Sequence, residues 1–177
     1  MILVTGFSQF PGVPENPTEH LALALNGTEV EGQDLVGVVL PVTYEGLSSR
    51  LTQLETRWRP ELVVGLGVAV GSERPRIEIL GVNEVAQTQD ASGRIAPDLG
   101  PGPRELRVGL PVEGIRQELG AELSRDAGRY LCNAWLYTAL RDLQAPALFV
   151  HVPMDAPSPQ RMGRAIARLW RELRARD

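Results

Sequence analysis

Short apolar stretches alternate with longer mixed stretches along the 177-residue chain. The apolar stretches are bounded by Gly, Pro or polar residues, which is typical of buried strands. We expect strands at residues 2–5, 35–42, 61–67, 76–85, 121–124 and 147–152. The mixed stretches have helical spacing. We expect helices at residues 17–26, 44–58, 112–119, 130–143 and 158–176.

Strands that alternate with helices predict an α/β fold, a single domain at residues 1–177 with an open twisted, mostly parallel sheet and helices on both faces. Ligands of such sheets bind beyond the carboxyl ends of the strands, so we expect the site there. Residues 86–111 show no period and hold six Gly or Pro between 93 and 103. They predict a long surface loop, either a functional lid or a disordered segment.

Composition and charge then exclude several functions. The chain has 43% hydrophobic and 23% charged residues, as globular proteins do. Its 18 basic and 22 acidic residues give a net charge of −4, which argues against a general nucleic-acid binder. Every basic residue is Arg, so no Schiff-base lysine and no phosphate-loop lysine can exist.

Location and metal content are also constrained. No apolar run approaches the roughly 20 residues that a bilayer span needs, and the N-terminus lacks the basic region of a signal peptide. We therefore expect a cytoplasmic protein without membrane contact. One Cys and two His, with no HExxH or CxxC spacing, make a poor metal set, and we expect no metal or cofactor.

The single cysteine, Cys132, lies in the first turn of a predicted helix, after Gly128. Unpaired N–H groups and the dipole at a helix N-terminus favour a thiolate and can hold an oxyanion. Cys132 is thus a candidate nucleophile. A buried core cysteine is the alternative interpretation, because such residues are common in apolar helices.

Two further residues could assist a nucleophilic cysteine. His151 ends an apolar strand and is the better candidate base, since we expect His20 to be a surface or half-buried residue of the first helix. Glu78 lies between apolar neighbours, where a carboxylate is seldom buried without a partner. A packed histidine and a solvent-facing glutamate are the structural alternatives.

These segments, taken in order, resemble the pyroglutamyl peptidase I family. The opening ILVTGFSQFPGVPENP is similar to the family's TGF-x-x-F-x-G…NP signature, and IEILGVN is similar to its catalytic-glutamate segment. The most specific matches are SRDAGRYLCNAWLY, against S-x-x-AG-x-x-x-CN-x-x-x-Y, and FVHVP, against FIHIP. LPVTYE, PELVVGLG and GRIAPDLG add weaker matches, so the resemblance covers nearly the whole chain.

The resemblance implies a cysteine peptidase that removes N-terminal pyroglutamate from peptides through a thioester, without metal or cofactor. It makes Cys132 the nucleophile, His151 the general base and acid, and Glu78 the orienting carboxylate. It also places Phe7, Phe10, Asn16 and Val68 at the substrate pocket, where aromatic walls suit a small uncharged lactam. Core packing of both Phe and a capping role for Asn16 are the alternatives. The resemblance further implies a homo-oligomer, with a tetramer suggested.

The chain departs from the family pattern at several positions. Ile79 stands where Arg usually follows the catalytic Glu, and Val68 where many members have Gln. The stretch around Arg94 is longer than usual, so no catalytic role is assigned to that residue. These departures keep two alternatives open: a related hydrolase of another small cyclic or blocked N-terminal amide, and a catalytically inactive binding homologue.

Overall fold

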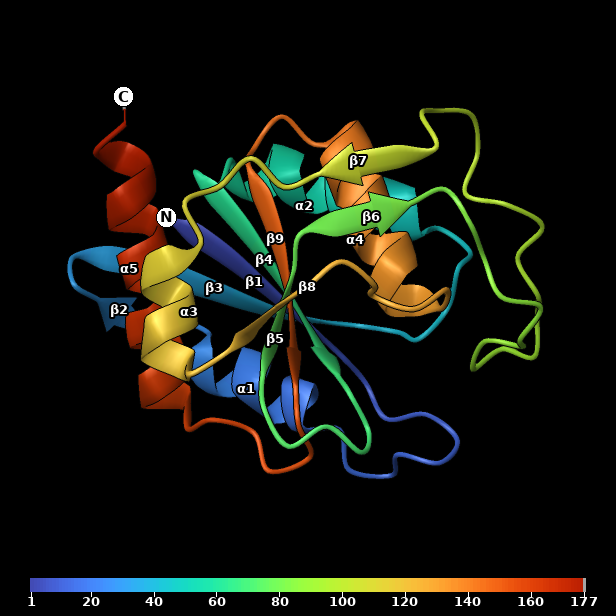
Figure 1. Ribbon diagram of the computed structural model, residues 1–177, viewed down its shortest axis with the longest axis horizontal. Helices are drawn as coiled ribbons and strands as arrows, with labels where there is room; N and C mark the ends of the chain where they lie inside the picture. Colours follow the sequence, from blue (N-terminus) through green and yellow to red (C-terminus); the bar gives the residue numbers. More distant parts are fainter. Residues whose placement is uncertain (177) are drawn as a thin grey trace.

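The computed structural model describes residues 1–176 and is built around a seven-stranded sheet of strand order β2-β3-β1-β4-β9-β5-β8 (Figure 1). Its strands are β2 (Glu29–Val30), β3 (Gln33–Leu40), β1 (Ile2–Phe7), β4 (Leu62–Val68), β9 (Ala147–Val152), β5 (Arg76–Glu78) and β8 (Glu122–Ser124). Strands β3, β1, β4 and β9 run parallel, whereas β5 is antiparallel to β9 and β2 is antiparallel to β3. The predicted fold class, a mostly parallel α/β sheet, is confirmed.

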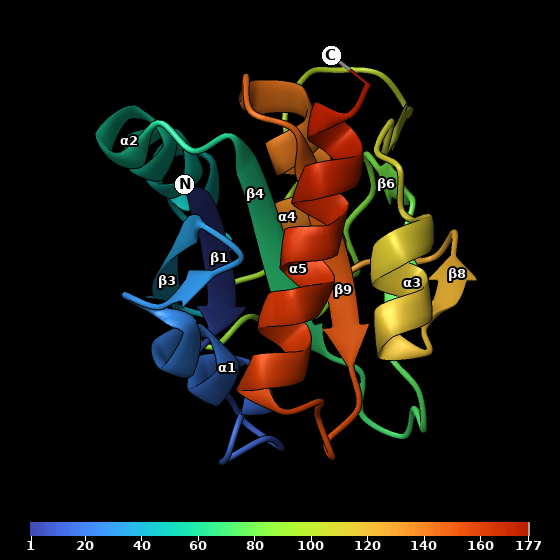
Figure 2. The same cartoon turned by 90° about the vertical axis from the view of Figure 1, so that its left-hand side faces the viewer.

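Five helices cover the two faces of this sheet. They are α1 (Pro17–Leu25), α2 (Leu47–Trp58), α3 (Glu113–Leu119), α4 (Leu131–Asp142) and α5 (Pro159–Arg174). Apolar side chains of α1, α3 and α5 pack on one face, and those of α2 and α4 pack on the other. Figure 2 shows α1, α5 and α3 together on the near side of the sheet.

Alternation along the central strands decides which residues meet α4. In β4, Leu62, Val64 and Leu66 join the core under α1, α3 and α5, so Gly65 and Gly67 face the opposite side. In β9, Val150 and Val152 likewise join that core, whereas Ala147 and Phe149 join the core under α2 and α4. Glycine is required at position 65 because a Cβ there would lie 2.8 Å from the Trp135 ring of α4.

The predicted strand at residues 76–85 is wrong as a single element. The chain forms β5 and then β6 (Leu80–Val82), which pairs with β7 (Glu105–Arg107) in a separate two-stranded sheet. Ile79 lies between them, donates its N–H to Ser124 O and accepts from Val108 N. The partial alternation of residues 76–85 runs across the break and does not mark it, because the two halves differ only in the strands with which they pair. The short strands β2 and β7 were also missed.

The long loop after β6 is held to the body of the protein. Arg141 of α4 bonds the carbonyl oxygen of Leu99, and the Tyr137 hydroxyl donates to Pro103 O at 2.7 Å. Nearer its start, Asp90 is buried and accepts from the backbone N–H of Tyr44 at 3.0 Å. The prediction of a loop is confirmed for residues 86–104, and these contacts order it.

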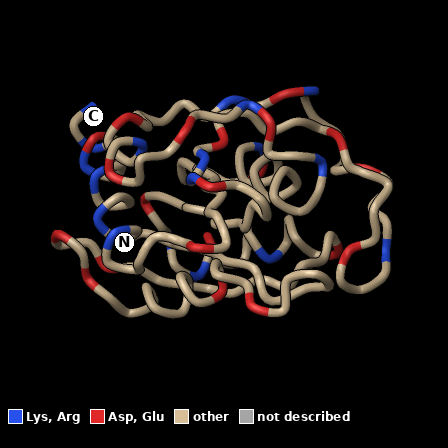
Figure 3. The backbone as a smooth tube through the Cα atoms, turned by 60° about the horizontal axis from the view of Figure 1, so that its bottom comes forward, with Lys and Arg blue, Asp and Glu red and all other residues tan. Residues whose placement is uncertain are grey.

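Charged residues of the outer surface pair across elements. Blue and red segments lie beside one another along the C-terminal helix in Figure 3. Arg164 and Arg168 of α5 both pair with Glu118, at 3.2 and 3.4 Å, and Arg171 pairs with Glu31 at 3.0 Å. Three arginines of α5 therefore have acidic partners at the surface. Among residues 1–176, no helix combines the length and apolar character that crossing a membrane requires.

Candidate active site

Cys132 is the second residue of α4, and its side chain lies against the sheet. A Cβ built on Gly67 would be 2.7 Å from the Cys132 Sγ, so the missing side chain makes room for the sulfur. Tyr130, the N-cap residue of α4, makes no side-chain capping hydrogen bond. The N–H groups of the first turn around Cys132 therefore lack an intrahelical partner and a side-chain cap.

His151 is the neighbour of Gly67 on the adjacent strand. The parallel register of β4 and β9 pairs Gly67 directly with His151. The imidazole Nδ1 lies 2.7 Å from Glu78 Oε1, which leaves Nε2 for Cys132. Glu78 is 0% exposed and His151 is 5% exposed, so Glu78 does not face solvent, and the two side chains are buried and bonded to each other.

The charge state of His151 follows from its neighbours. Burial disfavours the charged imidazolium, but the negative charge of Cys132 and hydrogen bonds with Cys132 and Glu78 outweigh it and raise the His151 pKa to about 9. At neutral pH the imidazole is therefore protonated between a sulfur and a carboxylate. An imidazole held between a thiol and a carboxylate in this way can activate the thiol and later return a proton.

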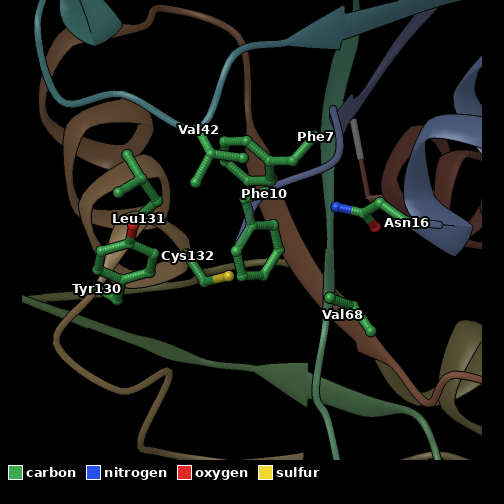
Figure 4. A pocket seen from close by; sticks show the side chains of 8 residues that line it. All are labelled: Phe7, Phe10, Asn16, Val42, Val68, Tyr130, Leu131 and Cys132. Atoms are coloured by element: carbon green, nitrogen blue, oxygen red, sulfur yellow. The ribbon is translucent and has the colours of Figure 1, made fainter. Parts of the chain in front are cut away.

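A small cavity of about 60 Å³ adjoins the sulfur. Its lining comes from the ends of β1 and β4, the loops that follow β1 and β3, and the start of α4: Phe7, Phe10, Asn16, Val42, Val68, Tyr130, Leu131 and Cys132. Figure 4 shows the Cys132 sulfur pointing toward the ring of Phe10, with Val68 and Asn16 on the opposite wall. The structure thus places all four predicted pocket residues beside the predicted nucleophile.

The polar side chains of this cavity are already hydrogen-bonded. Asn16 caps α1 by accepting from Thr18 N at 3.1 Å, and its Nδ2 donates to Ser8 O at 3.0 Å. The Tyr130 hydroxyl donates to Gln89 O at 3.1 Å. The capping alternative for Asn16 is therefore correct, and the residue lines the cavity as well. A wall of this kind suits a small uncharged group.

Three cavity residues were not foreseen. Tyr130 and Leu131 precede Cys132 directly, so the helix start that presents the sulfur also builds the wall. Val42 follows the end of β3, a position where this fold places ligand contacts. The position of Val42 at the end of a predicted strand is the signal that could have identified it.

Other candidates lie away from this site. Arg94 is 65% exposed and pairs with Glu45 of a neighbouring loop. Ile79 packs against the core under α1, α3 and α5. His20 is exposed on α1, as expected. Among residues 1–176 no cluster of three or more His, Cys, Asp or Glu could hold a metal ion.

The class of protein follows from fold and site together. A thiol, an imidazole and a buried carboxylate at the carboxyl edge of an open α/β sheet form the arrangement of a cysteine hydrolase. The family model of pyroglutamyl peptidases matches residues 1–160. The chain belongs to the pyroglutamyl peptidase family, and the predicted enzyme class is confirmed at that level.

Individual relatives agree with this assignment. The pyrrolidone-carboxylate peptidase of Oceanobacillus iheyensis is 33% identical over 166 residues, which cover 86% of this chain and 83% of that protein. That of Thermococcus kodakarensis is 30% identical over 178 residues, covering 89% and 86%. The solved pyrrolidone carboxyl peptidase of Pyrococcus furiosus superposes with a TM-score of 0.86 at 26% identity, covering 99% of this chain and 98% of that one.

Proposed function

We propose that this protein removes an N-terminal pyroglutamyl residue from peptides, with Cys132 as nucleophile, His151 as general base and acid, and Glu78 as orienting carboxylate. The observation that carries the proposal is one constellation. The Cys132 sulfur lies over Gly67 at the mouth of an apolar cavity, and the residue paired with Gly67 is a histidine held by a buried carboxylate.

The reaction uses these groups in sequence. The Cys132 thiolate attacks the pyroglutamyl carbonyl carbon, and the oxyanion that forms is held by the N–H groups at the start of α4. His151 gives its proton to the leaving amine as the C–N bond breaks, which leaves a thioester. His151 then takes a proton from water, the hydroxide attacks the thioester, and pyroglutamate and the thiolate are released.

The cavity accounts for the preference for a lactam. Pyroglutamate is uncharged, with an apolar ring edge, and the cavity walls are mainly Phe and aliphatic side chains. An N-terminal ammonium or a free carboxylate would be desolvated there, and apart from the Cys132 thiolate no lining side chain carries a charge that could offset this cost. Substrates with a free N-terminus are thereby disfavoured.

The test is hydrolysis of a pyroglutamyl arylamide beside the alanyl and prolyl analogues. We expect selective release from the pyroglutamyl compound that prior iodoacetamide treatment abolishes. Because Cys132 is the only thiol in the chain, alkylation identifies the nucleophile. The variant Cys132→Ser is expected to lose nearly all activity, and full activity in this variant would contradict the mechanism.

The same panel separates the alternatives. Selective cleavage of another cyclic or blocked N-terminal amide would replace the substrate while leaving the chemistry in place. A folded protein that cleaves none, with a thiol that reacts as slowly as a free cysteine at neutral pH, would indicate an inactive binding homologue.

Location and assembly complete the proposal. We place the protein in the cytoplasm, because a nucleophilic thiol is preserved in a reducing compartment. We also propose a homo-oligomer, a tetramer by resemblance to the family. Sedimentation of the purified protein tests the second statement, and a monomer at working concentration would contradict it.

A further inference from the structure

Arg76 lies beside the buried carboxylate on the same strand. Arg76 and Glu78 are two residues apart on β5, so their side chains share the face that meets α4. The antiparallel register of β5 and β9 pairs Arg76 directly with His151. The Arg76 Nε lies 3.6 Å from Glu78 Oε1, the same oxygen that accepts from the imidazole.

Polar atoms of this pair are left without hydrogen bonds. Glu78 Oε2 and Arg76 Nε are both buried, and neither has a hydrogen-bond partner among the described residues. Within residues 1–176, Arg76 is the one arginine that pairs with Glu78. The carboxylate therefore has two sources of positive charge: His151, when protonated, and Arg76.

The positive charge of His151 is lost during the reaction, whereas that of Arg76 is permanent. In the proposed mechanism His151 gives up its proton to the leaving amine, and at that moment it no longer neutralises Glu78. A buried carboxylate without a counter-charge is strongly disfavoured. Arginine keeps its charge at every accessible pH. Arg76 is thus placed to neutralise Glu78 in the steps where His151 is neutral.

We propose that Arg76 is a positioning residue: it holds Glu78 charged and oriented while His151 changes its charge during turnover. Arg76 acts through Glu78, with which its guanidinium pairs. This inference rests on the proposed function, because it assigns Arg76 to the same reaction. Its side chain is 36% exposed, so its field is partly screened and the effect is moderate.

The test compares Arg76→Gln and Arg76→Lys with the wild type on a pyroglutamyl arylamide. We expect kcat to fall about tenfold in Arg76→Gln with KM unchanged, because one partly screened charge is lost away from the cavity. Arg76→Lys is expected to recover part of kcat. Added guanidinium ion should also raise kcat in Arg76→Gln, which a purely structural role would not allow.

The matched control is Arg74→Gln. Arg74 lies two residues earlier, is 70% exposed and pairs with Glu122 at 3.9 Å, away from the site. It is expected to retain wild-type kcat. Unchanged kcat in Arg76→Gln, or a loss that neither lysine nor guanidinium restores, would overturn the inference. If Arg76→Gln does not fold, the intermediate kcat expected of Arg76→Lys decides the matter.

A second readout separates this inference from the proposed function. The rate of Cys132 alkylation by iodoacetamide at neutral pH needs no pyroglutamyl substrate. We expect this rate to fall in Arg76→Gln and not in Arg74→Gln. If the wild type cleaves no pyroglutamyl compound, and alkylation is nevertheless slower in Arg76→Gln and unchanged in Arg74→Gln, the proposed function fails and the role of Arg76 stands. If the wild type cleaves the pyroglutamyl arylamide, and Arg76→Gln changes neither kcat nor the alkylation rate, the proposed function stands and the role of Arg76 fails.

Discussion

The sulfur of Cys132 occupies the place where Gly67 would carry a side chain. A Cβ on Gly67 would be 2.7 Å from Sγ and 2.6 Å from the Phe149 ring. The Cys132 side chain therefore packs directly on the backbone of β4, and the next strand carries His151 at the same level of the sheet. Close approach of helix α4 to the sheet thus sets the geometry between sulfur and imidazole.

Gly67→Ala is expected to abolish most activity. Distances under 3.0 Å cannot be accommodated without movement, so the new methyl group must displace the Cys132 side chain or the Phe149 ring. A displacement of about 1 Å at a reacting atom costs on the order of 100-fold in rate. Measurement of kcat/KM with the pyroglutamyl arylamide checks this expectation.

The control for this variant is Gly109→Ala. Gly109 is exposed, and no atom lies within 4 Å of a Cβ built there. We expect wild-type kcat/KM for this variant. Wild-type kcat/KM in Gly67→Ala, with the same melting temperature as the wild type, would mean that the sulfur does not rest on β4 during the reaction.

Much of the site was accessible from the sequence because its residues occupy recognisable positions. Cys132 follows a glycine turn at a helix start, and His151 ends an apolar strand. Those local patterns identified Cys132 and His151 as candidates for nucleophile and base. The order of the motifs along the chain, which resembles that of a known family, then combined them into one site. The side of each strand that faces α4 is known only from the strand register. His151 and Glu78 meet because β5 runs antiparallel to β9.

The remaining features depend on contacts between distant segments. Nothing in the partial alternation of residues 76–85 marks the change of partner at Ile79, since the partner strands of its two halves lie elsewhere in the chain. The capping and pocket interpretations of Asn16 looked exclusive in sequence, and one buried side chain fulfils both. Nothing in the sequence singles out Arg76, because its position opposite His151 follows from the pairing of β5 with β9.

Activity is expected to decline as pH rises through about 9. In the proposed mechanism the leaving amine takes its proton from the His151 imidazolium. Burial lowers the His151 pKa, but the Cys132 charge and the hydrogen bonds with Cys132 and Glu78 outweigh it and raise the pKa to about 9. The chain has only two histidines, so an NMR titration resolves His151 from His20. In Cys132→Ser the negative charge is removed, and the His151 pKa should fall. A His151 that titrates identically in both proteins would contradict the ion pair.

The same shift links His151 to stability. A group whose pKa is raised on folding stabilises the folded state fully below its ordinary value, here 6.5, and this contribution is lost as pH rises toward 9. The contribution of His151 to the free energy of unfolding should therefore decline across that window. Urea unfolding of the wild type and His151→Gln at pH 6 and pH 9 measures this contribution. The same difference in the free energy of unfolding at both pH values would contradict the prediction.

Asn16 should contribute to both stability and substrate binding. Asn16→Ala removes the cap of α1 and the hydrogen bond to Ser8 O, so we expect the free energy of unfolding to fall by about 2 kcal/mol. Asn16→Ser keeps a capping oxygen and should lose about half as much. Both variants open the cavity wall and should raise KM. Urea titration and steady-state kinetics separate the two effects; equal stability of both variants would remove the capping role.

Two tyrosine hydroxyls should affect stability in opposite directions. The Tyr44 hydroxyl is buried with no hydrogen-bond partner among residues 1–176, and burial raises its pKa to about 12. Removing an unsatisfied buried group is favourable, so Tyr44→Phe should raise the free energy of unfolding by about 1 kcal/mol. The Tyr137 hydroxyl donates to Pro103 O at 2.7 Å, and Tyr137→Phe should lower it by about 1 kcal/mol. Both variants keep the ring, which makes each the control for the other in urea unfolding. Destabilisation by Tyr44→Phe would mean that its hydroxyl is hydrogen-bonded in solution.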